Sequence, residues 1–287
     1  MVDDDSPMPG TEVHYLKSEH VGDEFKILVA QCPGVGPPSG VLYLGDAFYN
    51  FGTAVEIVRL LAPFGDIPPI LVVSIGHRHD DGDPHGPAQR SRDFTPSVDA
   101  TRPPLTPYSY GGASRFASFL GDELKPWVES RYPVDPDDTT YFGYSLGGLF
   151  ATYLLFNHTG MFKRYGIGSP SLGWDNDLMF DHEARYADTH DDLPARVHFS
   201  VGGYENTAGE RRWVEQHSEE DRATAEAEAV QEPFDLIADT QRMVDQLRGR
   251  QYARLSLDFE VFPGEYHHTA PPLALSRALR YLLNAPR

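Results

Sequence analysis

The stretch that decides the fold is TTYFGYSLGG at residues 139–148, which runs into the apolar segment Leu149–Phe156. Its first four residues are typical of a strand, and the apolar segment is typical of a buried helix. Gly-x-Ser-x-Gly stands between them, in the strand–turn–helix context that this motif requires. Small glycines permit a sharp turn, which lifts the Ser145 hydroxyl above the carboxyl edge of the sheet. The pattern therefore predicts a nucleophilic serine, against the plainer alternative of a tight turn with an incidental serine.

Predicted strands and helices alternate on both sides of this turn. The run Ile70–Ile75 is almost continuously apolar, as in a strand buried on both faces of a parallel sheet. Leu255–Phe262 alternates apolar and polar residues, as an edge strand does, and Pro126 predicts a kink or a restart in its helix. Strands are expected at 13–16, 25–30, 41–44, 70–75, 139–142, 165–168, 196–201 and 255–262, and helices at 53–61, 116–131, 149–156, 234–247 and 273–283. This alternation predicts an α/β fold, a three-layer sandwich with a mostly parallel central sheet and helices on both faces.

Length, charge and cysteine content narrow the class further. The chain has 287 residues, which we interpret as a flexible tail over 1–10 and a single domain over 11–287. Its 43 acidic and 24 basic residues give a net charge of −19, so we expect neither nucleic acids nor membranes as partners. The one cysteine, Cys32, excludes a disulfide within the chain. The acidic start Met1–Asp5, with no apolar run of about 18 residues, predicts a cytoplasmic protein.

The candidate base and acid follow the nucleophile along the chain. A serine hydroxyl needs a histidine to take its proton, and this architecture has the order serine, acid, histidine. The loop after the last predicted strand carries His267 and His268, and spacing alone does not choose between them. Glu205 is the first carboxylate after the strand at 196–201 and is the expected acid. Two rival carboxylates in or near the next predicted helix are less well placed: Asp235 and Asp239.

Four more segments carry a resemblance to a known family: RSRDFTP at 90–96, ELKPW at 123–127, SPS at 169–171 and EYHHT at 265–269. With the serine motif, they resemble the α/β-hydrolase esterases that include enterobactin and other siderophore esterases. Feruloyl and acetylxylan esterases and S-formylglutathione hydrolase are more distant relatives of that group. The resemblance covers about residues 13–283 and implies the α/β-hydrolase fold and cleavage of a carboxylic ester.

The resemblance also implies roles for individual residues. The family's E-x-H-x-S ending is similar to residues 265–269 and implies His267 as the base. The family often has Asp-Gly where this chain has Gly45-Asp46-Ala47, one residue short of that pattern. The second oxyanion donor is then expected to be the N–H of Asp46 or Ala47. The first is the N–H of Leu146, which opens the helix after the serine.

The long irregular stretch 77–112 is expected to border the mouth of the site. Its Arg90 and Arg92 are candidates to clamp an anionic or catecholate substrate, with pairing to Asp93 or a loop carbonyl as the structural alternative. Trp174 is expected either to line a substrate pocket or to pack. The segment 206–232 is expected to be an exposed helix or lid fragment. Other residues of the irregular stretch lack the spacing of metal ligands, so neither a metal nor an organic cofactor is expected: His77, His79, Asp80, Asp81, Asp83 and His85.

Together these features predict a serine hydrolase that cleaves a small-molecule carboxylic ester through an acyl-enzyme. The expected catalytic residues are Ser145, His267 and Glu205. The alternatives are an acyltransferase that uses the same three residues, a peptidase of the same fold, and a binding protein without activity. The complete set of three argues against a binding protein, and the lack of an additional gating domain argues against a peptidase. Loop residues choose the ester, so neither the natural substrate nor the oligomeric state follows from the sequence.

Overall fold

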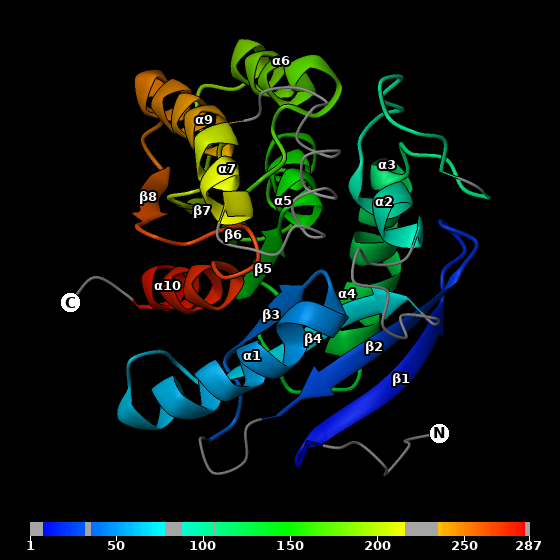
Figure 1. Cartoon of the computed structure of the whole chain (residues 1–287). Helices are drawn as coiled ribbons and strands as arrows, with labels where there is room; N and C mark the ends of the chain where they lie inside the picture. Colours follow the sequence, from blue (N-terminus) through cyan, green and yellow to red (C-terminus); the bar gives the residue numbers. More distant parts are fainter. Residues whose placement is uncertain (1–7, 32–35, 78–87, 106, 216–234, 285–287) are drawn as a thin grey trace.

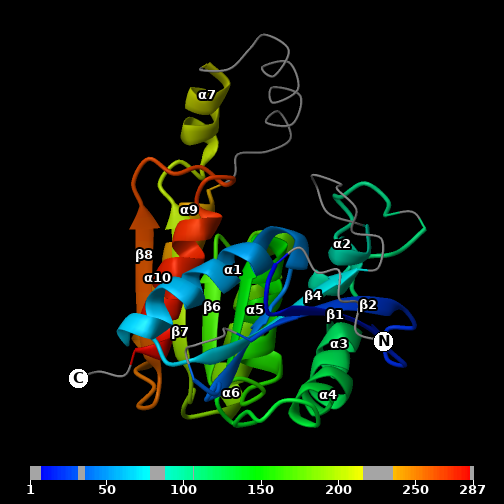
Figure 2. The same ribbon diagram turned by 90° about the horizontal axis from the view of Figure 1, so that it is seen from below.

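The computed structural model describes residues 8–31, 36–77, 88–105, 107–215 and 235–284. These residues form an eight-stranded sheet with the strand order β1-β2-β4-β3-β5-β6-β7-β8 (Figures 1 and 2). β1 and β2 form an antiparallel hairpin, β2 is antiparallel to β4, and every pair from β4 to β8 is parallel. The strands are β1 (Thr11–Lys17), β2 (Glu24–Ala30), β3 (Gly40–Leu44), β4 (Ile70–His77), β5 (Thr139–Tyr144), β6 (Arg164–Gly168), β7 (Arg196–Gly202) and β8 (Ser256–Phe262).

Helices cover both faces of this sheet and complete the three layers. On one face, α1 (Ala47–Leu61) and α10 (Pro271–Leu283) enclose a core that includes Phe51, Val55 and Leu275. The other face carries a larger core beneath α3 (Ala113–Ser118), α5 (Leu146–Asn157), α6 (Trp174–Thr189) and α9 (Leu236–Arg250). The predicted three-layer α/β sandwich is therefore confirmed. The predicted characters of two strands are also confirmed, because β4 is buried along its whole length and β8 lies at the edge of the sheet.

Several helix boundaries differ from the sequence prediction. α1 begins at Ala47 rather than at residue 53, directly after the loop that follows β3. The helix expected at 116–131 is three segments: α3, the π-helical turn η2 (Phe119–Leu124) and α4 (Lys125–Glu129). The backbone at both junctions is right-handed helical, so the segments follow one another without a shown kink, and the restart predicted from Pro126 is seen only as α4 beginning around it after the π-helical turn.

Two helices were not predicted at all. α6 does not follow from the sequence because its first turn is polar. In the structure that turn is irregular, since Asp175, Asn176 and Asp177 have left-handed φ values of 48°, 54° and 64°. α2 (Ala88–Phe94) lies within the stretch that was expected to be irregular. In the acidic segment, residues 207–215 form α7 (Thr207–Glu215), which stands beyond the tip of β8 in Figure 2. The remainder of that segment, 216–232, lies outside the described residues, as do residues 1–7 of the expected tail. A short 3-10 turn, η1 (Ala62–Phe64), follows α1.

None of the described helices is both long enough and apolar enough to cross a bilayer. What the fold supplies for function is the edge at which the parallel strands end. Parallel strands end at the same edge of a sheet, and the loops after β3, β5, β6, β7 and β8 therefore converge there.

Candidate active site

Ser145 occupies the turn between β5 and α5 in a strained backbone conformation, with φ 60° and ψ −120°. The turn is so tight that a Cβ on Gly143 would lie 2.0 Å from the carbonyl oxygen of Gly147. A Cβ on Gly148 would lie 2.6 Å from the carbonyl oxygen of Gly168 on the neighbouring strand. Side chains larger than hydrogen are excluded at both positions. The glycines of the motif therefore make the sharp turn possible, and the strain is located at the candidate nucleophile.

The loop after β8 brings one of the two adjacent histidines to this serine. His267 Nε2 lies 3.0 Å from Ser145 Oγ, which is hydrogen-bond distance for proton transfer to a base. The ring of His268 lies 5.6 Å from that of His267, at 81° to it. The geometry therefore agrees with the choice that the E-x-H-x-S resemblance implies.

Glu205 lies on the far side of the imidazole, in the loop after β7. Its Oε2 is 3.0 Å from His267 Nδ1, and the residue is only 2% exposed. Its Oε1 accepts hydrogen bonds from the backbone N–H of Gly202 and from the hydroxyls of Ser169 and Tyr144. Of the rival carboxylates, Asp235 instead caps α9 by accepting from Ala238 N at 2.9 Å.

The candidate oxyanion donors come from the starts of two helices. Leu146 is the first residue of α5, Ala47 is the first residue of α1, and Asp46 precedes Ala47 with a left-handed φ of 57°. N–H groups in a first helical turn have no acceptor within their own helix. A Cβ on Gly147 would lie 3.1 Å from Asp46 Oδ2, so the loop at 45–47 lies directly against the nucleophile turn.

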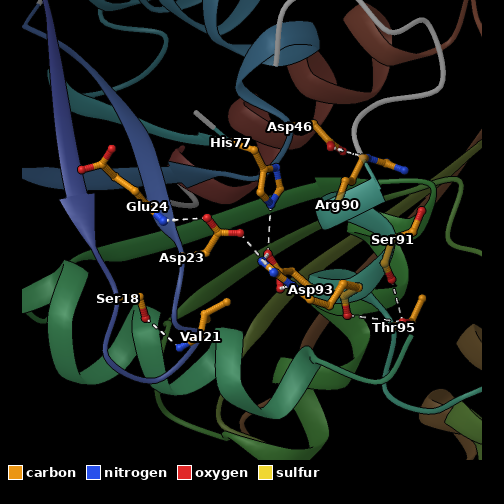
Figure 3. Close-up of polar contacts among 11 residues, drawn as sticks. Ser18, Val21, Asp23, Glu24, Asp46, His77, Arg90, Ser91, Asp93 and Thr95 are labelled. Atoms are coloured by element: carbon orange, nitrogen blue, oxygen red, sulfur yellow. Dashed lines mark hydrogen bonds and ion pairs between the residues drawn. The ribbon is translucent and has the colours of Figure 1, made fainter. Parts of the chain in front are cut away.

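Arg90 reaches this loop from α2, as Figure 3 shows. Its Nη2 donates to Asp46 Oδ2 at 2.8 Å, and its Nε donates to Asp46 Oδ1. Nη2 also lies 3.4 Å from the backbone oxygen of Tyr144, the residue before the serine. The guanidinium stands over the ring of Phe94, 5.4 Å from the ring centroid. This arginine therefore ties α2 to both the oxyanion loop and the nucleophile turn.

A sequence model of the family described as "Putative esterase" matches residues 18–241. The chain belongs to this esterase family. The ferri-bacillibactin esterase BesA of Bacillus subtilis is 29% identical to it, over 96% of this chain and 91% of BesA. The siderophore triacetylfusarinine C esterase of Aspergillus fumigatus is 29% identical, over 95% of this chain and 93% of that protein. The solved structure of the siderophore hydrolase EstA from Aspergillus nidulans matches with a TM-score of 0.80 at 25% identity, over 96% of this chain and 97% of EstA.

These similarities confirm the predicted α/β-hydrolase fold and show that the protein is a carboxylic ester hydrolase.

In this esterase, the second arginine of the RSRDFTP segment is buried. Arg92 donates from Nε and Nη2 to both carboxylate oxygens of Asp93 and from Nη1 to Asp23. Asp93 also contacts His77 Nε2 at 2.9 Å (Figure 3). Arg92 therefore has the contacts of the structural alternative rather than those of a substrate clamp.

Trp174 is likewise buried, at the start of α6. Its indole N–H donates to Ser97 Oγ at 3.2 Å, and its ring packs edge-on against Tyr110. This is the packing alternative of the sequence prediction. Of the residues weighed as metal ligands, His77 faces Asp93, and the others lie within 78–87, outside the described residues. Within the described ranges, no group of three residues is arranged to hold a metal ion.

Sequence reasoning missed two residues of the site, Tyr144 and Ser169. Tyr144 was assigned to the motif only as its variable position, and Ser169 only as part of the SPS segment. Ser169 has a left-handed φ of 39° and is fully buried, and both features are unusual for a serine in a turn. The signal that would have found them is the position of both residues at the ends of adjacent parallel strands, β5 and β6.

Proposed function

We propose that this esterase forms an acyl-enzyme on Ser145, with His267 as general base and Glu205 as the carboxylate that orients the imidazole. One observation carries the proposal, a continuous line of two contacts of 3.0 Å each. The first joins Ser145 Oγ to His267 Nε2, and the second joins His267 Nδ1 to Glu205 Oε2. A base held between a hydroxyl and a carboxylate has the tautomer that proton transfer from serine requires.

The reaction then follows from this geometry. His267 takes the proton of Ser145 as Oγ attacks the ester carbonyl. The resulting oxyanion accepts hydrogen bonds from the N–H of Leu146 and from the N–H of Asp46 or Ala47. The imidazolium, stabilised by Glu205, protonates the leaving alcohol. Water enters, His267 activates it, and hydrolysis releases the acid and restores Ser145.

The substrate class that we infer is an ester-linked siderophore. The support is the pair of full-length relatives, which are named for ferri-bacillibactin and for triacetylfusarinine C. These two names give different molecules, so the inference concerns the shared ester chemistry and not one siderophore. An acyltransferase would use the same three residues and is separated from a hydrolase only by its products.

The test of the nucleophile combines covalent labelling with substitution. A fluorophosphonate probe should add its mass once, to the peptide that contains Ser145. Ser145→Ala should remove the label and lower kcat on an aryl ester by about 10⁴-fold or more, because nucleophile and base act as a unit. Ser130→Ala, at an exposed serine that ends α4, is the matched control and should change neither. A loss below tenfold in a folded Ser145→Ala protein would refute the assignment.

The substrate class is tested with a panel of esters assayed in parallel. The panel holds a catecholate trilactone and an ester-linked hydroxamate siderophore, each with and without iron, besides a feruloyl ester and an acetylated sugar. We expect the highest kcat/KM for one of the siderophores. A tenfold preference for the feruloyl ester or the sugar would contradict the class. An acylated product formed from an added acceptor alcohol in place of the free acid would identify an acyltransferase.

A further inference from the structure

Tyr144, the last residue of β5, joins the candidate acid to the loop of the candidate base through one hydroxyl group. Its Oη lies 3.0 Å from Glu205 Oε1 and 2.8 Å from the backbone carbonyl oxygen of His267. Ser169 Oγ lies 2.9 Å from the same Oη and 2.7 Å from Glu205 Oε1. One tyrosine oxygen therefore contacts three different loops at the carboxyl edge of the sheet, those that follow β6, β7 and β8.

The cluster has four short contacts but only two hydroxyl protons, so not all four can be hydrogen bonds at the same time. Tyr144 and Ser169 each supply one proton, whereas Glu205 Oε1 and the His267 carbonyl are acceptors only. Ser169 can donate to Glu205 while Tyr144 donates to His267, or Ser169 can donate to Tyr144 while Tyr144 donates to Glu205. Each of these two arrangements gives the carboxylate one hydroxyl donor, and it has two when both hydroxyls donate to it; it has none only when Ser169 donates to Tyr144 and Tyr144 donates to His267. Only Tyr144 can also donate to the main chain of the base.

The ring of Tyr144 is fixed by its surroundings. A Cβ on Gly168 would lie 2.6 Å from Tyr144 Cδ2, so the ring rests directly on the backbone of β6. The ring also lies beside the imidazole of His267, with 5.1 Å between ring centroids, and belongs to the buried core of that face. Burial, followed by the negative charge of Glu205, raises the pKa of Tyr144 well above its usual value. The hydroxyl therefore keeps its proton throughout the pH range in which esterases work, and it remains a donor.

We infer that Tyr144 is a positioning residue of this esterase, and that its hydroxyl holds the carboxylate of Glu205 and the main chain of His267 in the arrangement that orients the imidazole. The inference rests on the proposed function, because it assigns Tyr144 a role only through those two residues. Tyr144→Phe keeps the ring packed on Gly168 and removes the hydroxyl that contacts both the Glu205 carboxylate and the His267 carbonyl. A misplacement of about 1 Å in a catalytic group can lower a rate by about 10²-fold.

The experiment compares Tyr144→Phe with Tyr43→Phe. Tyr43 is a matched control, because it is buried in the same sheet and its hydroxyl has no hydrogen-bond partner among the described residues. Active sites are counted by fluorophosphonate titration, so that kcat is expressed per reactive serine and a poorly folded fraction does not enter it. We expect Tyr144→Phe to lower kcat about 10- to 100-fold with KM changed less than threefold, and Tyr43→Phe to change neither.

A double-variant cycle shows whether the hydroxyl acts through the acid. Tyr144→Phe should lower kcat by a smaller factor in the Glu205→Gln variant than in the unmodified protein, and the two factors should differ at least threefold. Ser169→Ala should give a smaller, few-fold loss, because Tyr144 still donates to Glu205. The inference is overturned if kcat per site in Tyr144→Phe stays within twofold of the control, or if the loss is undiminished in the Glu205→Gln background.

Failure of the proposed function gives a different result. If the fluorophosphonate does not label Ser145 in the unmodified protein, the acyl-enzyme is refuted and the role of Tyr144 is refuted with it. If Ser145 is labelled and Tyr144→Phe is fully active, only the positioning role is refuted.

Discussion

The two sides of the candidate site are held by different forces. On the acid–base side, Ser145, Glu205 and His267 follow strands of one sheet, and neutral donors from Tyr144 and Ser169 surround a single buried carboxylate. On the oxyanion side, the loop before α1 is held by ion pairs, because Arg90 of α2 binds Asp46 from 44 residues away.

This difference predicts how each side of the site should respond to substitution. The acid–base side depends on geometry and on one buried charge, because neutral donors and the imidazole all converge on the Glu205 carboxylate, so it should fail when an atom is displaced or when that charge is removed. A buried ion pair is costly to break, because the remaining charge has no partner. α2 has a second ion pair to another part of the chain, the partly buried one between Arg92 and Asp23, and Arg92 also pairs with Asp93 of its own helix. The oxyanion side should therefore be sensitive chiefly to changes of charge.

The largest effect is expected at the base. His267→Ala should lower kcat by about 10⁴-fold, because without the imidazole nothing takes the proton of Ser145. His268→Ala is the matched comparison and should lower kcat less than tenfold. Steady-state kinetics on an aryl ester measures both. The reverse order would assign the base to His268 and contradict the 3.0 Å contact on which the acid–base side rests.

The next largest effect is expected at the acid. Glu205→Gln keeps the shape of the side chain but removes the charge that stabilises the imidazolium, and it should lower kcat by about 10³-fold. Asp235→Asn is the control, because it changes the rival carboxylate while asparagine still caps α9. That variant should keep full kcat. Equal losses in the two variants would mean that neither acts as the dedicated partner of His267.

The acid–base side could be predicted because its signals are local. The serine motif stands between an apolar strand and an apolar helix, and the acid and base follow in the order that the fold requires. Two observations then select among the candidates. The resemblance favours His267 over His268 as the base, and Glu205 is the first carboxylate after β7. Parallel strands bring these loops to one edge, so the order along the chain was sufficient to bring the side chains together.

The oxyanion side could not be predicted in the same way, because its contacts are long-range. Nothing near Asp46 in the sequence indicates that Arg90 binds it, and the substrate-clamp hypothesis arose from exposure that was expected in a loop. Arg92 is 7% exposed, which the polar composition around it did not indicate. Tyr144 was missed for a different reason: a tyrosine at the end of a buried strand is usually a packing residue, and its role depends on Ser169 and Glu205.

Acidification should destabilise the fold at β7, the strand that precedes the loop of the candidate acid. His198 lies buried on β7, and burial lowers its pKa to about 4, with Arg277 lowering it further and Asp258 opposing the shift. Its Nε2 is 3.5 Å from Asp258, and its ring also faces Tyr281. The unfolded value is about 6.5, so the folded protein binds this proton more weakly. The stability is therefore fully present above pH 6.5 and is lost as the pH falls towards 4.

The expected loss is about 3 kcal/mol in the free energy of unfolding over that range. Urea unfolding at pH 7, 6, 5 and 4.5 measures it in the unmodified protein and in His198→Gln, which cannot take up the proton. Carboxylates that do not contact His198 titrate alike in both proteins, so the difference between the two profiles isolates His198 together with its neighbour Asp258. Parallel profiles would contradict the prediction and would mean that β7 tolerates the charge.

The smallest effect is expected at the ion pair of the oxyanion side. Arg90→Gln frees the Asp46 loop and should lower kcat about tenfold, because the N–H groups of that loop then point less well at the oxyanion. The loss should be the same for a neutral aryl ester and for an anionic one. A direct substrate clamp would instead raise KM for the anionic ester alone. Arg248→Gln, at an exposed pair with Asp245, is the matched control and should be silent.

Asp46→Asn tests the same contact from its other end. If Arg90 acts by holding Asp46, the double variant should lose no more activity than either single variant. Additive losses would show that Arg90 has a second role. Its contact of 3.4 Å with the backbone oxygen of Tyr144 supplies one, since that carbonyl belongs to the residue that also holds Glu205. Additive losses would therefore indicate that Arg90 also acts on the acid–base side, through its contact with Tyr144.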